Sequence, residues 1–394
     1  MIMKKIAILL FCCLSAIFAF ANDGVFFAAG NQLIPITETD ISVKKEVLTI
    51  NRVGDHLEVT VYYEFFNPKG EKELLVGFEA EAPYPPQEEY MKLFPLQPHI
   101  RNFKVMMNGQ ILPFEVAHVE RWEDDGTGIY KRPSYVKNGL IQSWTRKQCE
   151  DSLIAWDYNS CPFDFVYHFK AKFRPGLNII QHTYDFDLSY SVEEEFFFPY
   201  ILTAANRWAN HQIDDFTLNI NMGNRESFYI LPEFYKDANE WNILGKGKVS
   251  MNNNWGMLDG ITPLFHIQEG SLSFHETNFS PEGELHILKR RFWSFSWAYW
   301  DDFGKDEANG LISDVKEQYN PLWVSNEDID KNVLSADQKR ILRNLPFAYR
   351  GYIFKTKSLQ DFFESTEWYI PNPSYDGNME ALSEGEKKWV KFWK

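Results

Sequence analysis

The chain has 394 residues, a length typical of two or three domains with a sizeable core. Its 40 basic and 55 acidic residues give a formal net charge of −15, which argues against a nucleic-acid partner. Hydrophobic residues make up 44 % and charged residues 24 %, values that exclude wholesale disorder and a multi-span membrane protein. The 33 Phe, 19 Tyr and 13 Trp are an unusually large aromatic share.

Residues 1–21 have the pattern of a secretory signal peptide. Lys4 and Lys5 precede an apolar run, and small residues flank Phe20 before the expected cleavage after Ala21. The alternative is a retained membrane anchor. We expect a periplasmic or extracellular protein without a transmembrane segment after signal cleavage, because no other apolar run is long enough to cross a bilayer.

Alternation of apolar and polar residues predicts antiparallel strands through a body at 22–310. The pattern is clear at 57–65 and again at 216–222. The segments 163–173 and 180–190 alternate in the same way around an Arg-Pro-Gly turn, which predicts a long antiparallel hairpin. Since no helices alternate with these strands, the fold class is mainly β, with an antiparallel β-sandwich-like body of one or two lobes.

The segment 122–161 carries Gly, Pro and charged residues without a clear period, and is predicted to be an insertion in the body. It contains Cys149 and Cys161, the two cysteines left after signal cleavage. In an oxidising compartment these are expected to form a disulfide. Two buried free thiols, or a redox pair, are the alternatives.

An aromatic run at 292–300 is the most unusual local feature. As a strand, it would place Trp293 and Trp297 on one face. Flat aromatic faces suit sugar rings or a peptide partner, so both are candidate binding residues. The alternative is burial in the core or against the C-terminal domain.

A compact helical domain is predicted at 325–394. A capping box, Ser335 with Gln338, begins one helix, which Pro346 is expected to end. Ser358 begins a second short helix, and another capping box precedes the last apolar segment. The chain therefore ends in a small α-helical domain.

The run 342–354, L-R-N-L-P-F-A-Y-R-G-Y-I-F, resembles the YARHG domain, a small extracytoplasmic module of bacterial proteins. Phe347, Tyr349 and Arg350 stand where the family motif has Tyr, Arg and His. The resemblance implies an envelope setting. The residues that match the YARHG motif serve either folding or binding. The candidates for binding are Arg343, Asn344, Tyr349, Arg350, Tyr352, Trp368 and Tyr369.

The body, about 22–300, is similar to a bacterial exported family of unknown function. Short segments in a fixed order carry this resemblance, and it implies no mechanism. They are residues 22–23, 28–33, 65–68, 173–176, 200–203 and 208–216.

Motifs for zinc proteases and for serine hydrolases are missing from the sequence, so we predict neither a catalytic residue, nor a metal site, nor a cofactor. We expect a non-catalytic binding protein of the cell envelope. Its expected partner is peptidoglycan or another glycan, and an envelope protein is the second candidate partner. One alternative is a cell-wall hydrolase that uses Asp214 and Asp215 with His211. Another is a structural subunit of an envelope assembly.

Overall fold

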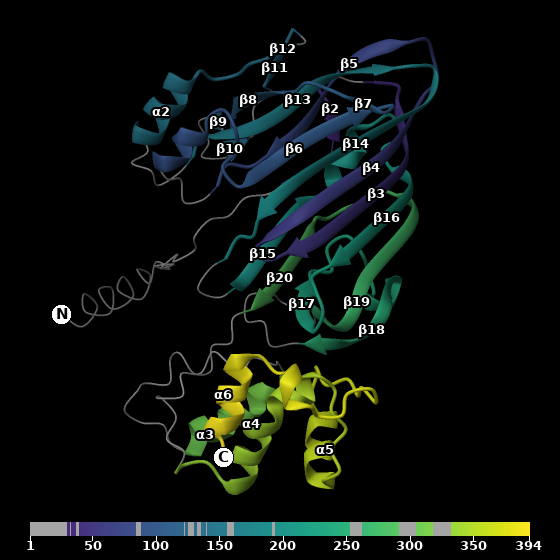
Figure 1. Cartoon of the computed structure of the whole chain (residues 1–394). Helices are drawn as coiled ribbons and strands as arrows, with labels where there is room; N and C mark the ends of the chain where they lie inside the picture. The colour runs from purple at the N-terminus through teal and green to yellow at the C-terminus, as the bar shows by residue number, and fades with distance from the viewer. Residues whose placement is uncertain are drawn as a thin grey trace, which may run out of the picture.

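The computed structural model of the chain is rich in strands up to Arg290 and helical from Lys305 onward (Figure 1). The structure describes residues 30–31, 33–36, 39–83, 88–121, 123–124, 130–131, 135–138, 140–155, 161–190, 194–252, 262–290, 305–317 and 332–394. The predicted signal peptide and the aromatic run with Trp293 and Trp297 lie outside these residues.

Twelve of the described strands form one large sheet, in the order β1-β15-β20-β17-β19-β16-β3-β4-β14-β6-β7, with β18 also paired to β19. Its pairs are antiparallel except β1 with β15 and β3 with β16. The strands are β1 (Gly30–Asn31), β3 (Ser42–Val53), β4 (His56–Asn67), β6 (Ile100–Met107), β7 (Gln110–Ile111), β14 (Gly176–Asp187), β15 (Glu194–Ile201), β16 (Ile213–Asn221), β17 (Glu226–Ile230), β18 (Trp241–Asn252), β19 (Thr262–Phe279) and β20 (Leu285–Arg290).

A second, four-stranded sheet has the order β2-β5-β13-β8. It contains β2 (Leu33–Pro35), β5 (Lys72–Ala80), β8 (Glu115–Glu120) and β13 (Phe163–Phe173). Between β8 and β13 lie two short ladders and one helix, β9 (Glu123–Asp124), β10 (Tyr130–Lys131), β11 (Val136–Lys137), β12 (Leu140–Ile141) and α2 (Arg146–Ala155). The 3-10 turns are η1 (Glu88–Leu93), η2 (Thr203–Arg207), η3 (Ala238–Glu240) and η5 (Met379–Ala381).

The hydrophobic core lies between the two sheets. Inward side chains alternate along each strand, as on β4, where every second residue from Leu57 to Phe65 is buried. Rings from the two sheets meet there: the ring of Phe78 lies 5.0 Å from that of Tyr184, and Phe103 lies 4.8 Å from Tyr167. The predicted mainly β class with a sandwich-like body is confirmed, and we call this part the β body.

The predicted hairpin of residues 163–190 is wrong, although both of its strands exist. β13 pairs with β5 and β8 in the small sheet, whereas β14 pairs with β4 and β6 in the large one. The buried Asn178 side chain accepts from the Arg174 N–H at 2.9 Å and donates to the carbonyls of Arg174 and Gly176. These bonds fix a turn, with Gly176 at φ 85°, that carries the chain from one sheet to the other.

Four helices, α3 (Lys305–Glu317), α4 (Ala336–Tyr349), α5 (Lys357–Glu364) and α6 (Glu384–Phe392), surround a separate apolar cluster below the β body (Figure 1). We call them the C-terminal unit. Helix α4 begins with the predicted capping box. However, Pro346 does not end this helix. A proline leaves the carbonyl four residues earlier without its usual donor. Here the Trp389 indole N–H donates to that carbonyl, of Leu342, at 2.7 Å.

Cys149 and Cys161 are free thiols, so the predicted disulfide is wrong. Both side chains are buried in the core, 0 % and 4 % exposed, and Cys161 Sγ donates to the Phe163 carbonyl at 3.3 Å. A thiol packed and hydrogen-bonded in this way is stable without a bridge. Burial raises the pKa of both thiols to about 12, so the reactive thiolate is scarce at neutral pH.

Both cysteines are therefore expected to resist alkylation in the folded protein. Iodoacetamide at pH 8 should leave Cys149 and Cys161 unmodified, and should modify both once guanidinium unfolds the chain without reductant. Peptide mass spectrometry resolves the two sites. Recovery of a Cys149–Cys161 cross-linked peptide from the unfolded sample would contradict the structure.

Candidate functional site

The β body and the C-terminal unit meet at the ends of β17, β18 and β19 (Figure 1). Among the described residues, hydrogen bonds from two side chains cross this junction: Lys248 Nζ donates to the Thr366 carbonyl at 2.9 Å, and Gln268 Nε2 donates to the Ile370 carbonyl at 3.1 Å. Beside them is a pocket, which we call the seam. It is lined by Arg225, Glu226, Ser227, His266, Ile267, Gln268, Tyr349, Trp368 and Ile370.

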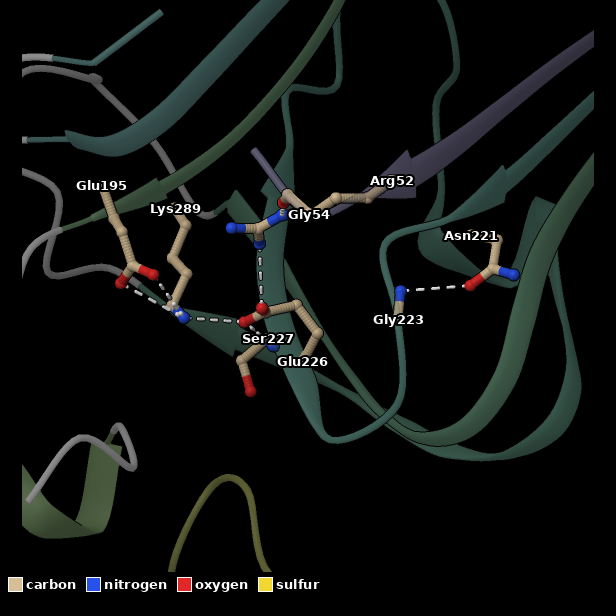
Figure 2. A network of polar contacts seen from close by, with 8 residues as sticks. All are labelled: Arg52, Gly54, Glu195, Asn221, Gly223, Glu226, Ser227 and Lys289. Carbon is tan, nitrogen blue, oxygen red and sulfur yellow. Dashed lines mark hydrogen bonds and ion pairs between the residues drawn. The ribbon is translucent and has the colours of Figure 1, made fainter. Parts of the chain in front are cut away.

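One ladder builds the wall that the β body contributes to the seam. Glu226 and Ser227 of β17 lie opposite Ile267 and His266 of β19. The turn before β17 is held by the Gly223 N–H, which donates to Asn221 Oδ1 at 3.1 Å (Figure 2). This turn also places Arg225 in a left-handed conformation, φ 57°, with its side chain exposed. The wall is therefore set by backbone pairing.

An ion-pair chain stiffens this wall from behind. Figure 2 shows Lys289 between two carboxylates, with Nζ 2.7 Å from Glu226 and 3.2 Å from Glu195. The Arg52 guanidinium donates to the other Glu226 oxygen at 3.1 Å and lies 4.8 Å from the Phe196 ring centre. Lys289 and Glu226 are only 13 % and 16 % exposed. The Glu226 carboxylate is thus paired with two cations, Lys289 and Arg52, which hold it in place.

His266 is held between two serines. Ser227 Oγ lies 2.9 Å from Nδ1 of the imidazole and Ser250 Oγ lies 3.0 Å from Nε2. Burial, with a smaller contribution from the charge of Lys248, lowers the pKa of His266 to about 3. The ring is therefore neutral at physiological pH and too weak a base to activate Ser227 as a nucleophile.

Two polar groups of the seam have unused binding capacity within the described residues. Gln268 Oε1 is buried without a hydrogen-bond partner there, and the exposed Arg225 forms no ion pair there. The C-terminal unit contributes aromatic surface from Tyr349 and Trp368. Burial, and next the Glu226 carboxylate, raise the pKa of Tyr349, so its hydroxyl stays protonated. The pocket is partly open to solvent, and its inner space has room for about one water molecule.

Of the binding residues predicted from the sequence, the seam brings together Tyr349 and Trp368. Trp368 also has a structural contact, because its indole N–H donates to the Val315 carbonyl at 2.6 Å. Trp293 and Trp297 lie outside the described residues.

Three other candidates form polar contacts within the C-terminal unit. Arg350 forms a two-pronged ion pair with Glu386, and the Tyr369 hydroxyl donates to the Tyr352 carbonyl at 2.9 Å. Asn344 donates to the carbonyl one turn earlier in α4. These contacts give Arg350, Tyr369 and Asn344 roles in folding.

The remaining two candidates differ in exposure. Tyr352 packs its ring edge-on against Phe354. Arg343 points to solvent.

The residues that the β body contributes to the seam were not predicted from the sequence. Arg225 and Gln268 lie 43 positions apart in the chain and match no short motif. One sequence pattern does indicate part of this wall. His266 and Gln268 are two residues apart on a strand otherwise rich in apolar residues, so their polar side chains lie on one face.

Both aspartates of the acidic pair in the hydrolase alternative form ion pairs with lysines. Asp214 pairs with Lys44 at 2.7 Å, and Asp215 pairs with Lys45 at 2.8 Å. Burial opposes ionisation of Asp214, yet the Lys44 hydrogen bond and its neighbours hold the pKa below its usual range. The Lys45 hydrogen bond lowers the pKa of Asp215. A general acid needs a raised pKa, so this pair does not favour hydrolysis.

Residues 322–394 match the family model of the YARHG domain, which confirms the resemblance of the C-terminal stretch. YARHG domains occur in exported proteins. A search of curated proteins finds no match to the chain. Among solved structures, the chain is similar to one described as a "putative nutrient binding protein" from Legionella pneumophila, at 17 % identity over 94 % of this chain and 99 % of that one, with a TM-score of 0.49. None of the described helices is long and apolar enough to span a membrane.

Proposed function

We propose that the chain is an exported, non-catalytic binding protein of the cell envelope, and that it holds its ligand at the seam. The observation that carries this proposal is the composition of the pocket. Aromatic surface from Tyr349 and Trp368 on the C-terminal unit faces the hydrogen-bonding groups of Arg225 and Gln268 on the β body. Ligand sites occur preferentially at such junctions, where a few polar groups orient a ligand against apolar walls.

The seam must widen to surround a ligand as large as a sugar ring. Its inner space has room for about one water molecule, and the pocket is partly open to solvent. The side-chain hydrogen bonds described across the junction are those of Lys248 and Gln268. Interfaces between two parts of one chain commonly permit relative motion of those parts. Ligand binding would then replace the Gln268 to Ile370 bond and expose the faces of Tyr349 and Trp368.

The chemistry of the seam favours an acidic glycan such as peptidoglycan. Aromatic rings offer large flat contact areas to sugar rings, and an amide such as that of Gln268 both donates to and accepts from hydroxyl groups. The guanidinium of Arg225 matches a single carboxylate. The formal net charge of −15 disfavours a dense polyanion, so isolated carboxylates on a mainly neutral polymer suit the protein better.

Co-sedimentation with isolated peptidoglycan sacculi tests this function. We expect the wild-type protein to sediment with sacculi and to release no soluble fragments. Arg225→Ala should weaken retention roughly ten-fold or more, because a charge-assisted hydrogen bond contributes about 1.5–3 kcal/mol. Arg174→Ala is the matched control, since this exposed arginine lies at the turn between β13 and β14, and it should bind like the wild type.

Three outcomes would count against the proposal. If wild-type protein stays in the supernatant, the glycan ligand is wrong. If Arg225→Ala and Arg174→Ala bind equally, the seam is not the binding site. Release of sugar fragments would instead favour the hydrolase.

A further inference from the structure

Three metal-ligating side chains converge on the outer face of the large sheet, on strands β4 and β14. His56 and Glu58 are two residues apart on β4, so they point to the same face. Asp185 lies directly opposite Glu58 on β14. One ligand atom from each of the three lies within 4.8 Å of the other two.

Neighbouring polar groups orient two of these side chains. Asn102 Nδ2 donates to Asp185 Oδ2 at 2.6 Å, which leaves the other carboxylate oxygen of Asp185 available. His56 Nδ1 lies 3.4 Å from Asp55 Oδ1. Metal-binding histidines and carboxylates are commonly held by supporting contacts of this kind, which fix the ring and the carboxylate plane.

The charge around the three side chains is negative. The acidic groups on this part of the face are Asp55, Glu58, Asp185 and Asp187. Arg101 is a positive charge on the same part of the face, and it pairs with Asp187. His99 Nδ1 also lies 3.6 Å from the Asp187 carboxylate. A cation would therefore be attracted to the surface.

We propose that His56, Glu58 and Asp185 bind one divalent transition-metal ion, of which Zn²⁺ and Mn²⁺ are the best candidates. One imidazole nitrogen and two carboxylate oxygens form a mixed ligand set that such ions accept, whereas Ca²⁺ and Mg²⁺ prefer oxygen alone. With three protein ligands, water completes the coordination shell. The ion links β4 to β14 across the sheet.

Only a small movement is needed to bind the ion. Two atoms that each lie about 2.1 Å from one ion are at most about 4.2 Å apart. This separation is slightly less than the 4.8 Å within which the three ligand atoms now lie. The Glu58 side chain is exposed and has the rotamer freedom to close this gap.

Calorimetry and thermal unfolding of the full-length protein, stripped with EDTA, test the site with Zn²⁺ or Mn²⁺ alone. We expect one ion per chain and a rise in Tm that grows with metal concentration. His56→Ala, Glu58→Gln and Asp185→Asn should each weaken binding at least ten-fold. Circular dichroism of the apo variants establishes that they are folded.

His275→Ala is the matched control. His275 is an exposed histidine of the same sheet, and it lies 3.0 Å from Asp215. His275 is outside the convergent group, so its removal should leave the affinity and the Tm shift unchanged. This readout is independent of ligand binding at the seam.

The proposal is overturned by any of three results. Equal binding by the wild type and His56→Ala would mean an adventitious ion only. Loss of binding in His275→Ala alone would place the ion elsewhere. Tighter binding of Ca²⁺ than of Zn²⁺ at these residues would show that the class of metal is wrong.

Discussion

Replacement of Arg350 by alanine is expected to lower the free energy of unfolding of the C-terminal unit by about 3–5 kcal/mol. Arg350 donates to both Glu386 oxygens, at 2.6 and 2.8 Å, and its side chain and that of Glu386 are 12 % and 7 % exposed. It also donates to the Pro346 and Ala381 carbonyls. Without Arg350, an ionised Glu386 would remain buried without its paired cation, although it would keep its hydrogen bond from the Ser383 N–H.

The pKa of Glu386 shows how strong this dependence is. Burial alone would raise the pKa, yet hydrogen bonds from Arg350 and Ser383 hold it below the usual range. The carboxylate is therefore charged at neutral pH, and Arg350 is its main compensating charge. This explains why an arginine serves well where the family motif has histidine: its planar fork matches both oxygens of the carboxylate.

Guanidinium unfolding followed by tryptophan fluorescence measures this effect, because Trp368, Trp389 and Trp393 belong to the core of the C-terminal unit. The control is Arg343→Ala, an exposed arginine on the same helix, which should change stability by less than about 0.5 kcal/mol. The double variant Arg350→Met with Glu386→Leu should lose less than either charge-removing single variant. Equal stability of Arg350→Ala and Arg343→Ala would refute the ion pair's role.

The second large effect is a loss of stability in acid. Burial lowers the pKa of His182 and His266 to about 3 and that of His118 to about 4. In the unfolded chain each pKa is near 6.5, so between these values the unfolded state binds protons that the folded state does not. Stability is therefore full above about pH 6.5 and falls with acidification, by about 1.4 kcal/mol per pH unit for each histidine.

His182 and His266 provide a matched pair for this test. Neither ring nitrogen of His182 has a hydrogen-bond partner among the described residues, and its ring stacks between Tyr63 and Tyr184 at 5.8 and 6.0 Å. Leucine there should be neutral or stabilising at pH 7. Leucine at 266 should destabilise by about 1–3 kcal/mol, because it leaves Ser227 and Ser250 without their bond to the imidazole.

Both leucine variants should show a smaller loss of stability between pH 6.5 and pH 4.5 than the wild type. Urea unfolding at each pH gives this slope directly. An unchanged slope in His182→Leu would show that this histidine is charged in the folded protein, which is contrary to its burial.

Local patterns predicted elements better than connections. The alternation in residues 163–173 and 180–190 identified two strands, because period two records which side chains face a core. It carries no information on which sheet the strand joins, and that choice depended on Asn178 closing the turn. In the same way, proline predicted a helix end, but the Trp389 indole, 43 residues away, satisfied the carbonyl that Pro346 freed.

The candidate site was harder to predict than the fold. Aromatic residues of the C-terminal stretch, such as Tyr349 and Trp368, were identified because they cluster in a recognisable motif. Their partners, Arg225 and Gln268, come from a different part of the chain and are defined only by strand pairing. The metal-ligating group was missed for the same reason, since Asp185 meets Glu58 only through the register of β14 on β4.

The parallel pairing of β3 with β16 has a consequence for how the protein is made. Lys44 and Asp214 at this junction are 170 residues apart. A chain that emerges from the ribosome N-terminus first can pair β3 with β4 early, but it leaves the other edge of β3 open until β16 has been synthesised. An open strand edge invites pairing with other chains, and such distant contacts form slowly. The half-made chain therefore exposes a strand edge that the finished sheet covers.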